Sequence, residues 1–183
     1  MKNKYLGLFG QLDKETATHS VRVAEICKYL APVIGIDEDL AYTIGYVHDI
    51  GKMYIPSRII KKSEALTELE RDIVDMHSFY GYRLLKELGD PKEIYLPVLY
   101  HHGFDKPKLY FKEGCGMLSK ELAALISMVH SADIFDAMQS KRVYHEPFSI
   151  EETLAELAND PLCTEDIYNA LSGCLLYRKV VSF

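Results

Sequence analysis

Apolar residues recur at intervals of three and four positions along almost the whole chain, and no run of six or more residues alternates cleanly between apolar and polar. This spacing is typical of amphipathic helices, whereas alternation would indicate strands. Capping signals and helix-ending glycines place the helices approximately at 14–34, 37–48, 67–88, 90–102, 119–138, from 149 onwards, and 164–177. The pattern therefore predicts an all-α bundle of six to eight helices.

Two of these helices begin with a recognisable capping box. Thr67 is followed three residues later by Glu70, and Ser149 is followed at the same spacing by Glu152. In such a box each side chain accepts a hydrogen bond from the other residue's backbone N–H, which satisfies donors that a helix start leaves free. The third predicted helix runs from Thr67 without interruption to about Leu88.

Length and composition are those of one ordinary globular domain. The chain has 183 residues and a mass of 20.9 kDa, with 48% apolar and 26% charged residues. It contains no repeat, low-complexity tract or linker, so we expect a single domain over residues 1–183. The 21 basic and 27 acidic residues give a net charge of −6. This charge disfavours nucleic-acid polymers and anionic lipid surfaces as partners, because both attract a basic face.

Nothing in the sequence indicates a membrane or an oxidising compartment. No stretch approaches the roughly 20 apolar residues of a membrane span, and the N-terminal apolar run is too short for a signal peptide. The four cysteines include no CxxC pair, which favours free thiols over a disulfide framework or a cysteine-bound zinc. We therefore expect a cytoplasmic protein without membrane association.

Several predicted helices carry a histidine or aspartate on an otherwise apolar stripe. His19, for example, shares a stripe with Val23 and Ile26, and Asp133 follows Val129 at helical spacing. One such histidine alone would be interpreted as a hydrogen-bonded core residue. A buried carboxylate, however, needs a cation, and few basic residues lie within these stripes. Metal ions explain the whole set most simply: His19, His48, His77, His101, His102, Asp133 and Asp136.

The number and type of these donors indicate a binuclear centre. Structural zinc usually takes four ligands that include cysteine, whereas six or seven nitrogen and oxygen donors are available here. Such a set suggests two metals that share a bridging carboxylate, as in enzymes that displace phosphoesters. Donors of this kind favour iron or manganese, with zinc, magnesium or nickel as alternatives.

The segment His48-Asp49-Ile50-Gly51-Lys52 resembles the signature of the HD superfamily of metal-dependent phosphohydrolases. The similarity extends from about Glu15 to Leu157 and includes "HSVRVAEICKYLA", "LTELERDIVDMHSFYGYRLLKEL", "YHHGFDKP" and "SADIFDAMQSKRVY". The order of the segments is most similar to the HD-GYP branch, bacterial phosphodiesterases that act on cyclic di-GMP. The chain departs from that branch after His102, where the glutamate and the Gly-Tyr-Pro turn are missing. The resemblance thus implies an HD-domain helical bundle and its metals, but not that substrate.

The resemblance also implies a role for each ligand. One metal would be held by His19, His48, Asp49 and Asp133, and Asp49 would bridge to a second metal held by His77, His101 and His102. Some relatives bind a third metal through a glutamate at the position of Glu15. The alternative for Glu15 is an ordinary acid in the first turn of a helix, where it complements the helix dipole.

Two basic residues are candidates for binding substrate. Lys52 ends the HD motif and could contact a phosphate as a point charge; the alternative is a solvated lysine. Arg142 could clamp a phosphate through two hydrogen bonds, or it could pair with a carboxylate such as Asp136. We interpret Asp136 as a residue that supports the site or the fold. His130 and His145 match no motif and are expected not to be ligands.

These features predict hydrolysis of a phosphoester in a nucleotide or cyclic dinucleotide, by a hydroxide activated between the two metals. Asp49 and Lys52 are the expected catalytic residues. The loop from Gly103 to Leu118 combines lysines with aromatic residues, and it is expected to be either a lid over the site or a passive connection. Any regulation would require a separate signalling partner.

Two other functions are compatible with the fold. Some proteins of this type use a di-iron pair on the same ligands to activate oxygen, although Lys52 favours phosphate chemistry. A catalytically degenerate signalling or interaction domain is the second alternative. The intact ligand set argues against it, because such a domain would have no reason to keep seven metal donors.

Overall fold

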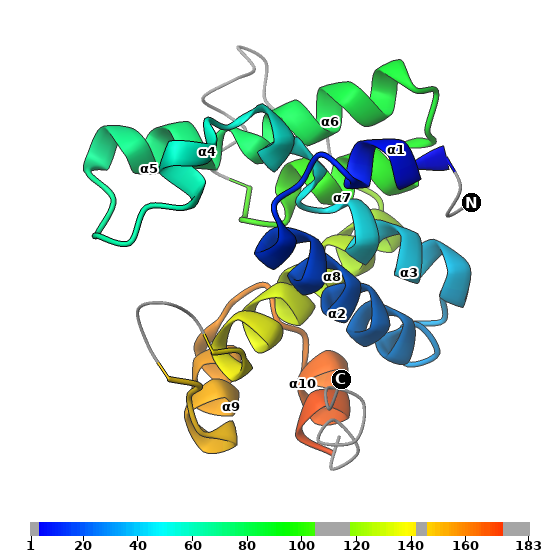
Figure 1. Cartoon of the computed structure of the whole chain (residues 1–183). Coiled ribbons are helices and arrows are strands. Elements are labelled where there is room, and N and C mark those ends of the chain that lie inside the picture. The colour runs from blue at the N-terminus through cyan, green and yellow to red at the C-terminus, as the bar shows by residue number, and fades with distance from the viewer. Residues whose placement is uncertain (1–3, 105–117, 142–145, 174–183) are drawn as a thin grey trace.

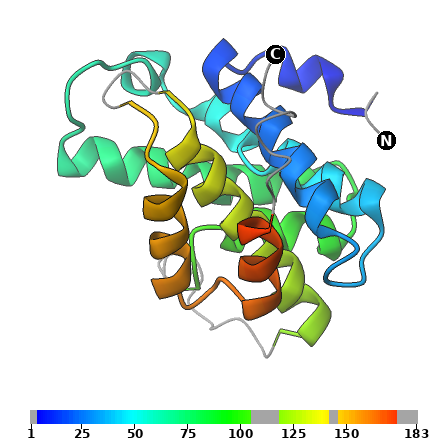
Figure 2. The ribbon, with the colours of Figure 1, turned by 90° about the horizontal axis from the view of Figure 1, so that it is seen from below.

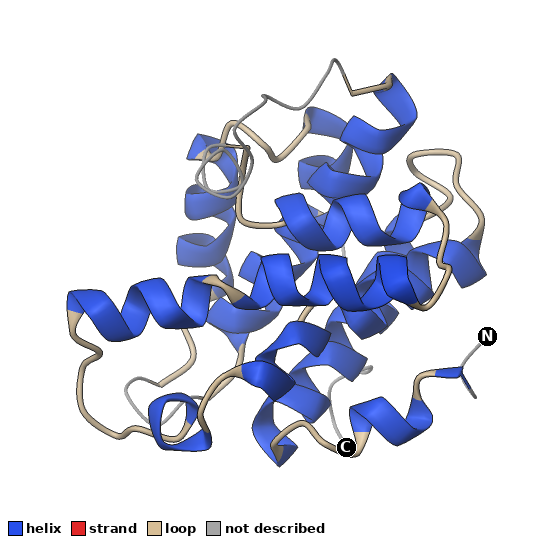
Figure 3. Cartoon of the chain, turned by 90° about the horizontal axis from the view of Figure 1, so that it is seen from above, coloured by secondary structure: helices blue, strands red, loops and turns tan. Residues whose placement is uncertain are grey.

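The computed structural model describes residues 4–104, 118–141 and 146–173. Eight helices of eight residues or more occur in these ranges: α2 (Lys14–Leu30), α3 (Glu38–Val47), α5 (Glu68–Asp75), α6 (His77–Glu87), α7 (Lys92–Tyr100), α8 (Lys120–Gln139), α9 (Ile150–Asn159) and α10 (Glu165–Ser172). Three shorter elements join them: α1 (Leu6–Phe9), the 3-10 helix η2 (Ile50–Tyr54) and α4 (Ser57–Ile60). The same ranges contain no strand (Figure 3), which confirms the predicted all-α class.

The helix starts follow the capping residues. Thr67 and Glu70 form the predicted capping box of α5, and Ser149 and Glu152 form that of α9. The carboxylate of Asp13 accepts hydrogen bonds from two backbone N–H groups of the first turn of α2. Local sequence therefore determines where these helices begin.

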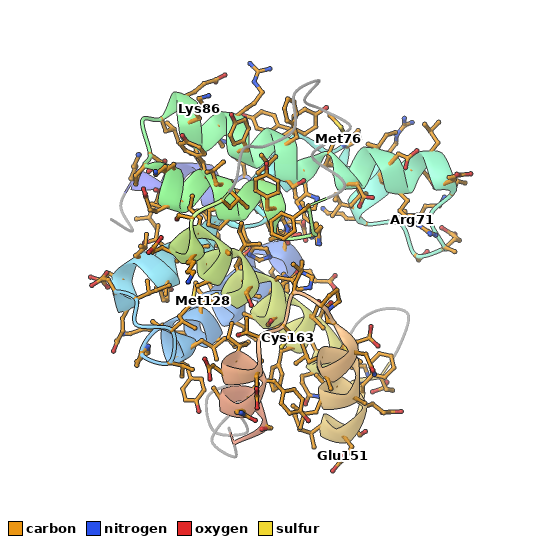
Figure 4. All side chains as sticks on the ribbon, turned by 180° about the vertical axis from the view of Figure 1, so that it is seen from behind. Arg71, Met76, Lys86, Met128, Glu151 and Cys163 are labelled. Carbon is orange, nitrogen blue, oxygen red and sulfur yellow. The ribbon has the colours of Figure 1, made fainter. Side chains whose placement is uncertain are left out.

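One predicted helix is interrupted. The expected helix over 67–88 is wrong as a single element, because it divides at Met76 into α5 and α6 (Figure 4). The Nδ1 atom of His77 donates to the carbonyl of Val74 (2.6 Å), and the hydroxyl of Ser78 donates to the carbonyl of Asp75 (3.2 Å). These two side chains thus hydrogen-bond to carbonyls that would accept backbone N–H groups in an unbroken helix. As a result, His77 becomes the first residue of α6.

Other element ends differ less. Helix α2 ends at Leu30 rather than near residue 34, since Pro32 has no N–H to donate to the carbonyl of Lys28. Helix α10 is described as far as Ser172. The predicted end of that helix, and the Gly103–Leu118 loop apart from its two ends, lie outside the described residues.

Helix α8 lies at the centre of the bundle, in contact with α2, α3, α7 and α9 (Figure 2). The sequence of α8 fits this central position, because its own apolar residues lie around most of the helix rather than on one stripe. The core is formed by fully buried side chains from these helices, among them Val23, Ile44, Val98, Val129 and Phe135. Helices α4 and α5 instead project from the body as an arm (Figure 1).

No described helix combines the length and the apolar character that crossing a membrane requires. Cys27 and Cys163 are free thiols, as expected, and Cys27 is buried in the core. The other two cysteines, Cys115 and Cys174, lie outside the described residues.

Candidate metal centre

The seven predicted ligands come together in the interior, although they belong to separate elements. His19 is on α2, Asp133 is on α8, and His77 is the first residue of α6. The pair His48-Asp49 follows α3, and the pair His101-His102 follows α7. Their donor atoms form three groups, each within 4.8 Å: His19 with His48 and Asp133; His48 with Asp49 and His101; and His77 with His101 and His102.

Three of the histidines are held in the same way. The Nδ1 atoms of His48, His77 and His101 each donate to the backbone carbonyl three residues earlier, at 2.8, 2.6 and 2.7 Å. Each of these residues stands at the end or the start of a helix, where such a carbonyl is accessible. A neutral imidazole that donates from Nδ1 presents a lone pair at Nε2. All three rings therefore direct an acceptor atom toward the interior of the donor cluster around Asp49.

The acceptor atoms of these rings lie close together, as they do in proteins when histidines share a cation. The Nε2 atoms of His77 and His101 are 3.2 Å apart, although neither carries a proton to share. The Nε2 atom of His48 is buried and has no hydrogen-bond partner. Burial lowers the pKa of His77 to about 3 and lowers that of His101 well below its usual value. Both rings thus remain neutral at physiological pH, the state in which imidazole binds metals.

Asp49 has the geometry expected of a bridging ligand. Its Oδ1 atom is 3.2 Å from Nε2 of His77, whereas Oδ2 is 3.5 Å from Nε2 of His48 and 3.8 Å from Nε2 of His19. Lys52 also contacts Oδ2, at 2.6 Å. Burial alone would raise the pKa of Asp49, but Lys52 and the histidines hold it well below the usual value. The carboxylate is therefore ionised and faces both halves of the site.

His19 differs from the other histidines because carboxylates contact both of its nitrogen atoms. Its Nε2 is 2.9 Å from Asp133 and its Nδ1 is 2.7 Å from Asp136. Burial would lower the pKa of His19, but hydrogen bonds to the two carboxylates raise it to about 9. Metal binding at Nε2 would therefore release a proton from this ring.

Arg22 is a residue of the site that the sequence did not reveal. Its Nε and Nη2 atoms donate to the two oxygens of Asp136, at 2.6 and 2.8 Å. The arginine that pairs with Asp136 is thus Arg22, one turn after His19, and the alternative partner Arg142 lies outside the described residues. The spacing of His19 and Arg22 on one helix face was the signal that could have identified it.

The remaining predicted residues lie around this centre. His130 is outside the three donor groups and contacts the carbonyl of His101 and the carboxylate of Asp160. Glu15 also lies outside those groups, so its role as a third-metal ligand stays a prediction. His145 lies outside the described residues.

A cleft of about 1180 Å³ opens beside the centre and includes His19, Lys52 and Glu15 among its walls. It lies between the start of α2, the end of α8 and the α4–α5 arm, whose Arg71 is labelled in Figure 4. Among the described residues that line it, seven are basic and three are acidic: Lys14, Arg22, Lys52, Lys61, Lys62, Arg71 and Lys141, against Asp13, Glu15 and Glu64. The cleft is therefore basic in a chain whose net charge is −6.

Comparisons with known proteins identify the family of this chain. A family model described as "HD domain" matches residues 16–160. A cyclic di-GMP phosphodiesterase of Thermotoga maritima is 33% identical over 181 residues, which cover 92% of this chain and 44% of that protein. A 3'3'-cGAMP-specific phosphodiesterase of Vibrio cholerae is 29% identical over 170 residues, 86% of this chain and 35% of the relative. The chain thus spans less than half the length of these relatives.

A solved structure has a similar fold. The HD domain of the phosphodiesterase PgpH from L. monocytogenes, determined in complex with cyclic-di-AMP, superposes with a TM-score of 0.66 at 22% identity. The match covers 97% of this chain and 98% of that one. At this level of identity the similarity concerns the arrangement of the helices.

Proposed function

The chain belongs to the HD domain family, and from this membership we propose that it is a metal-dependent phosphodiesterase that hydrolyses a cyclic dinucleotide. The observation that carries the proposal is the convergence of the Nε2 atoms of His48, His77 and His101 around the buried carboxylate of Asp49, with each ring fixed by a hydrogen bond from Nδ1 to a backbone carbonyl. The two relatives described above, which match most of this chain, are phosphodiesterases of cyclic di-GMP and of 3'3'-cGAMP. Their names support a cyclic dinucleotide as the substrate class.

We propose that the centre takes two divalent metal ions, iron or manganese. His19, His48 and Asp133 would hold one, His77, His101 and His102 would hold the other, and Asp49 would bridge them. When bound, such ions lower the pKa of water and neutralise charge on a phosphoryl group. Asp49 contributes by remaining ionised, and the backbone carbonyls contribute by fixing the orientation of three imidazoles.

The cleft residues would bind and orient the anionic substrate. Lys52 lines the cleft and stands beside Asp49, so it would contact the phosphate that enters the centre. Lys14, Lys61 and Arg71 line the same cleft and would attract the rest of the ligand. Arg142 follows Lys141 of the cleft wall and remains a proposed phosphate contact. This basic surface favours a phosphate ester over the neutral organic substrate that an oxygenase could take.

The proposal can be tested by metal analysis followed by activity assays. Protein supplied with iron or manganese should contain two ions per chain and should hydrolyse at least one of cyclic di-GMP, 3'3'-cGAMP and cyclic di-AMP. Asp49→Ala should abolish the activity, whereas Asp39→Ala, an exposed acid on α3, should not. Protein that carries two ions and hydrolyses none of these compounds, nor linear dinucleotides or mononucleotides, would refute the proposed function.

A further inference from the structure

The four proposed ligand histidines whose Nδ1 partners are described do not receive the same support. His48, His77 and His101 donate to neutral carbonyls of their own chain segment, three residues away. The Nδ1 atom of His19 instead contacts the carboxylate of Asp136, at 2.7 Å. Asp136 lies on α8, 117 positions further along the chain. A charged oxygen is a stronger partner than a neutral one. The two halves of the centre are therefore electrostatically unequal.

Asp136 is itself fixed from several sides. It is fully buried, and both of its oxygens accept hydrogen bonds from Arg22, at 2.6 and 2.8 Å. The hydroxyl of Ser140 adds a third contact to Oδ2, at 3.2 Å, and Nη2 of Arg22 also donates to that hydroxyl, at 2.8 Å. A two-pronged guanidinium pair of this kind limits rotation of the carboxylate. The ring of His19 is thereby held against one fixed acceptor.

We propose that Asp136 is a positioning residue that makes the metal position at His19 the tighter of the two. This inference rests on the two-metal centre of the proposed function. A carboxylate behind a ligating imidazole orients the ring and increases its basicity, and loss of such a partner typically weakens metal binding by about 10–100-fold. In the other metal position, the Nδ1 atoms of His77 and His101 contact backbone carbonyls instead of a carboxylate. The stronger donor at His19 would thus fill its position first.

The test is a titration of metal-free protein with Mn²⁺, read by equilibrium dialysis and elemental analysis, with no substrate present. The unmodified protein should bind two equivalents in two separable steps. In Asp136→Asn the tighter step should weaken by about 10–100-fold, while the other step keeps its affinity. His77→Ala should have the converse effect and remove the weaker step. Binding of both ions by Asp136→Asn with unchanged affinities, or an equal loss of both, would overturn the proposal.

Two further variants separate positioning from a merely structural role. Arg22→Gln keeps the carboxylate behind His19, so it should retain the tighter step even though it removes the ion pair between Arg22 on α2 and Asp136 on α8. Equal weakening in Arg22→Gln and Asp136→Asn would mean that the pair only holds the helices together. If Asp136→Asn fails to fold, the double variant Arg22→Met/Asp136→Asn removes both charges and avoids an unpaired buried ion. It should fold and show the same selective loss.

These results are independent of activity. Two unequal Mn²⁺ steps in a protein that hydrolyses no phosphodiester would leave the role of Asp136 in place and refute the proposed function. If the protein hydrolyses a phosphodiester but both binding steps respond equally to Asp136→Asn, the proposed function stands and the role of Asp136 is refuted.

Discussion

Replacement of Gly51 by alanine tests how closely the HD segment approaches the helix that carries His77. Gly51 lies in η2, is buried, and packs directly against the start of α6. A Cβ atom added there would stand 2.5 Å from the backbone nitrogen of Gly81 and 2.9 Å from the carbonyl carbon of His77, with the His77 carbonyl oxygen closer still. Real Cβ contacts essentially never fall below 3.0 Å. Helix α6 must therefore move away by at least 3.0 − 2.5 = 0.5 Å.

This displacement exceeds what the metal centre can absorb, since metal–ligand distances vary by only about 0.2 Å. Because α6 begins with His77, its movement withdraws one ligand from the proposed second metal. Overpacking of this kind typically costs about 1–3 kcal/mol, and each kcal/mol shifts the melting temperature of a domain of this size by about 2–4 °C. Gly51→Ala should therefore lower the melting temperature of metal-free protein by about 2–12 °C. It should also lose one bound ion.

The assay combines thermal unfolding of the metal-free protein with elemental analysis of the metal-loaded protein. Gly7→Ala is the matched control, because Gly7 lies within α1 and an added Cβ meets no atom within 4 Å. That change should leave metal content unchanged and should not reduce stability. A Gly51→Ala protein with an unaltered melting temperature and two bound ions would show that η2 and α6 leave room for a methyl group at this position.

Three further outcomes follow from the site and its surroundings. Asp49→Ala should reduce bound metal from two ions to none, because the carboxylate serves both positions; metal analysis that still finds two ions would show that it does not bridge. The double variant Lys61→Ala/Arg71→Ala should raise the Michaelis constant for a cyclic dinucleotide severalfold and flatten its salt dependence, with no change in metal content. An unchanged Michaelis constant would show that neither Lys61 nor Arg71 contributes to substrate binding. Glu70 has a pKa lowered to about 2 by its hydrogen bond with Lys62, so its stabilising effect is complete above pH 4.5 and is lost as the pH falls from 4.5 to 2. An NMR titration of Glu70 with a midpoint near 4.5 would contradict that pairing.

Residue spacing identified most of the candidate donors because their chemistry conflicts with their positions, whereas Asp49 was identified through the family resemblance. An aspartate such as Asp133 on an apolar stripe needs a compensating charge, and the structure places it 2.9 Å from His19. Capping boxes were equally visible, since they depend on residues only three positions apart. The same local rules predicted the starts of α5 and α9.

The features that the sequence did not reveal depend on side chains whose partners are set by the fold. The division at Met76 was missed because apolar spacing continues through it, while the cause is a bond from the His77 ring to a backbone carbonyl. Arg22 was missed because an arginine on a helix is usually solvated. Only the docking of α2 on α8 shows that its partner is the buried Asp136.

The distance along the chain between His19 and Asp136, 117 positions, has a consequence for how the protein acquires its metals. Joining segments so far apart costs chain entropy that local helix formation does not repay. A ribosome must synthesise the whole stretch from His19 to Asp133 before these two residues can meet. Until then His19 and His48 are present without Asp133, the carboxylate that completes their group. Metal uptake at the position formed by His19, His48 and Asp133 should therefore wait until α8 has been made and has packed against α2.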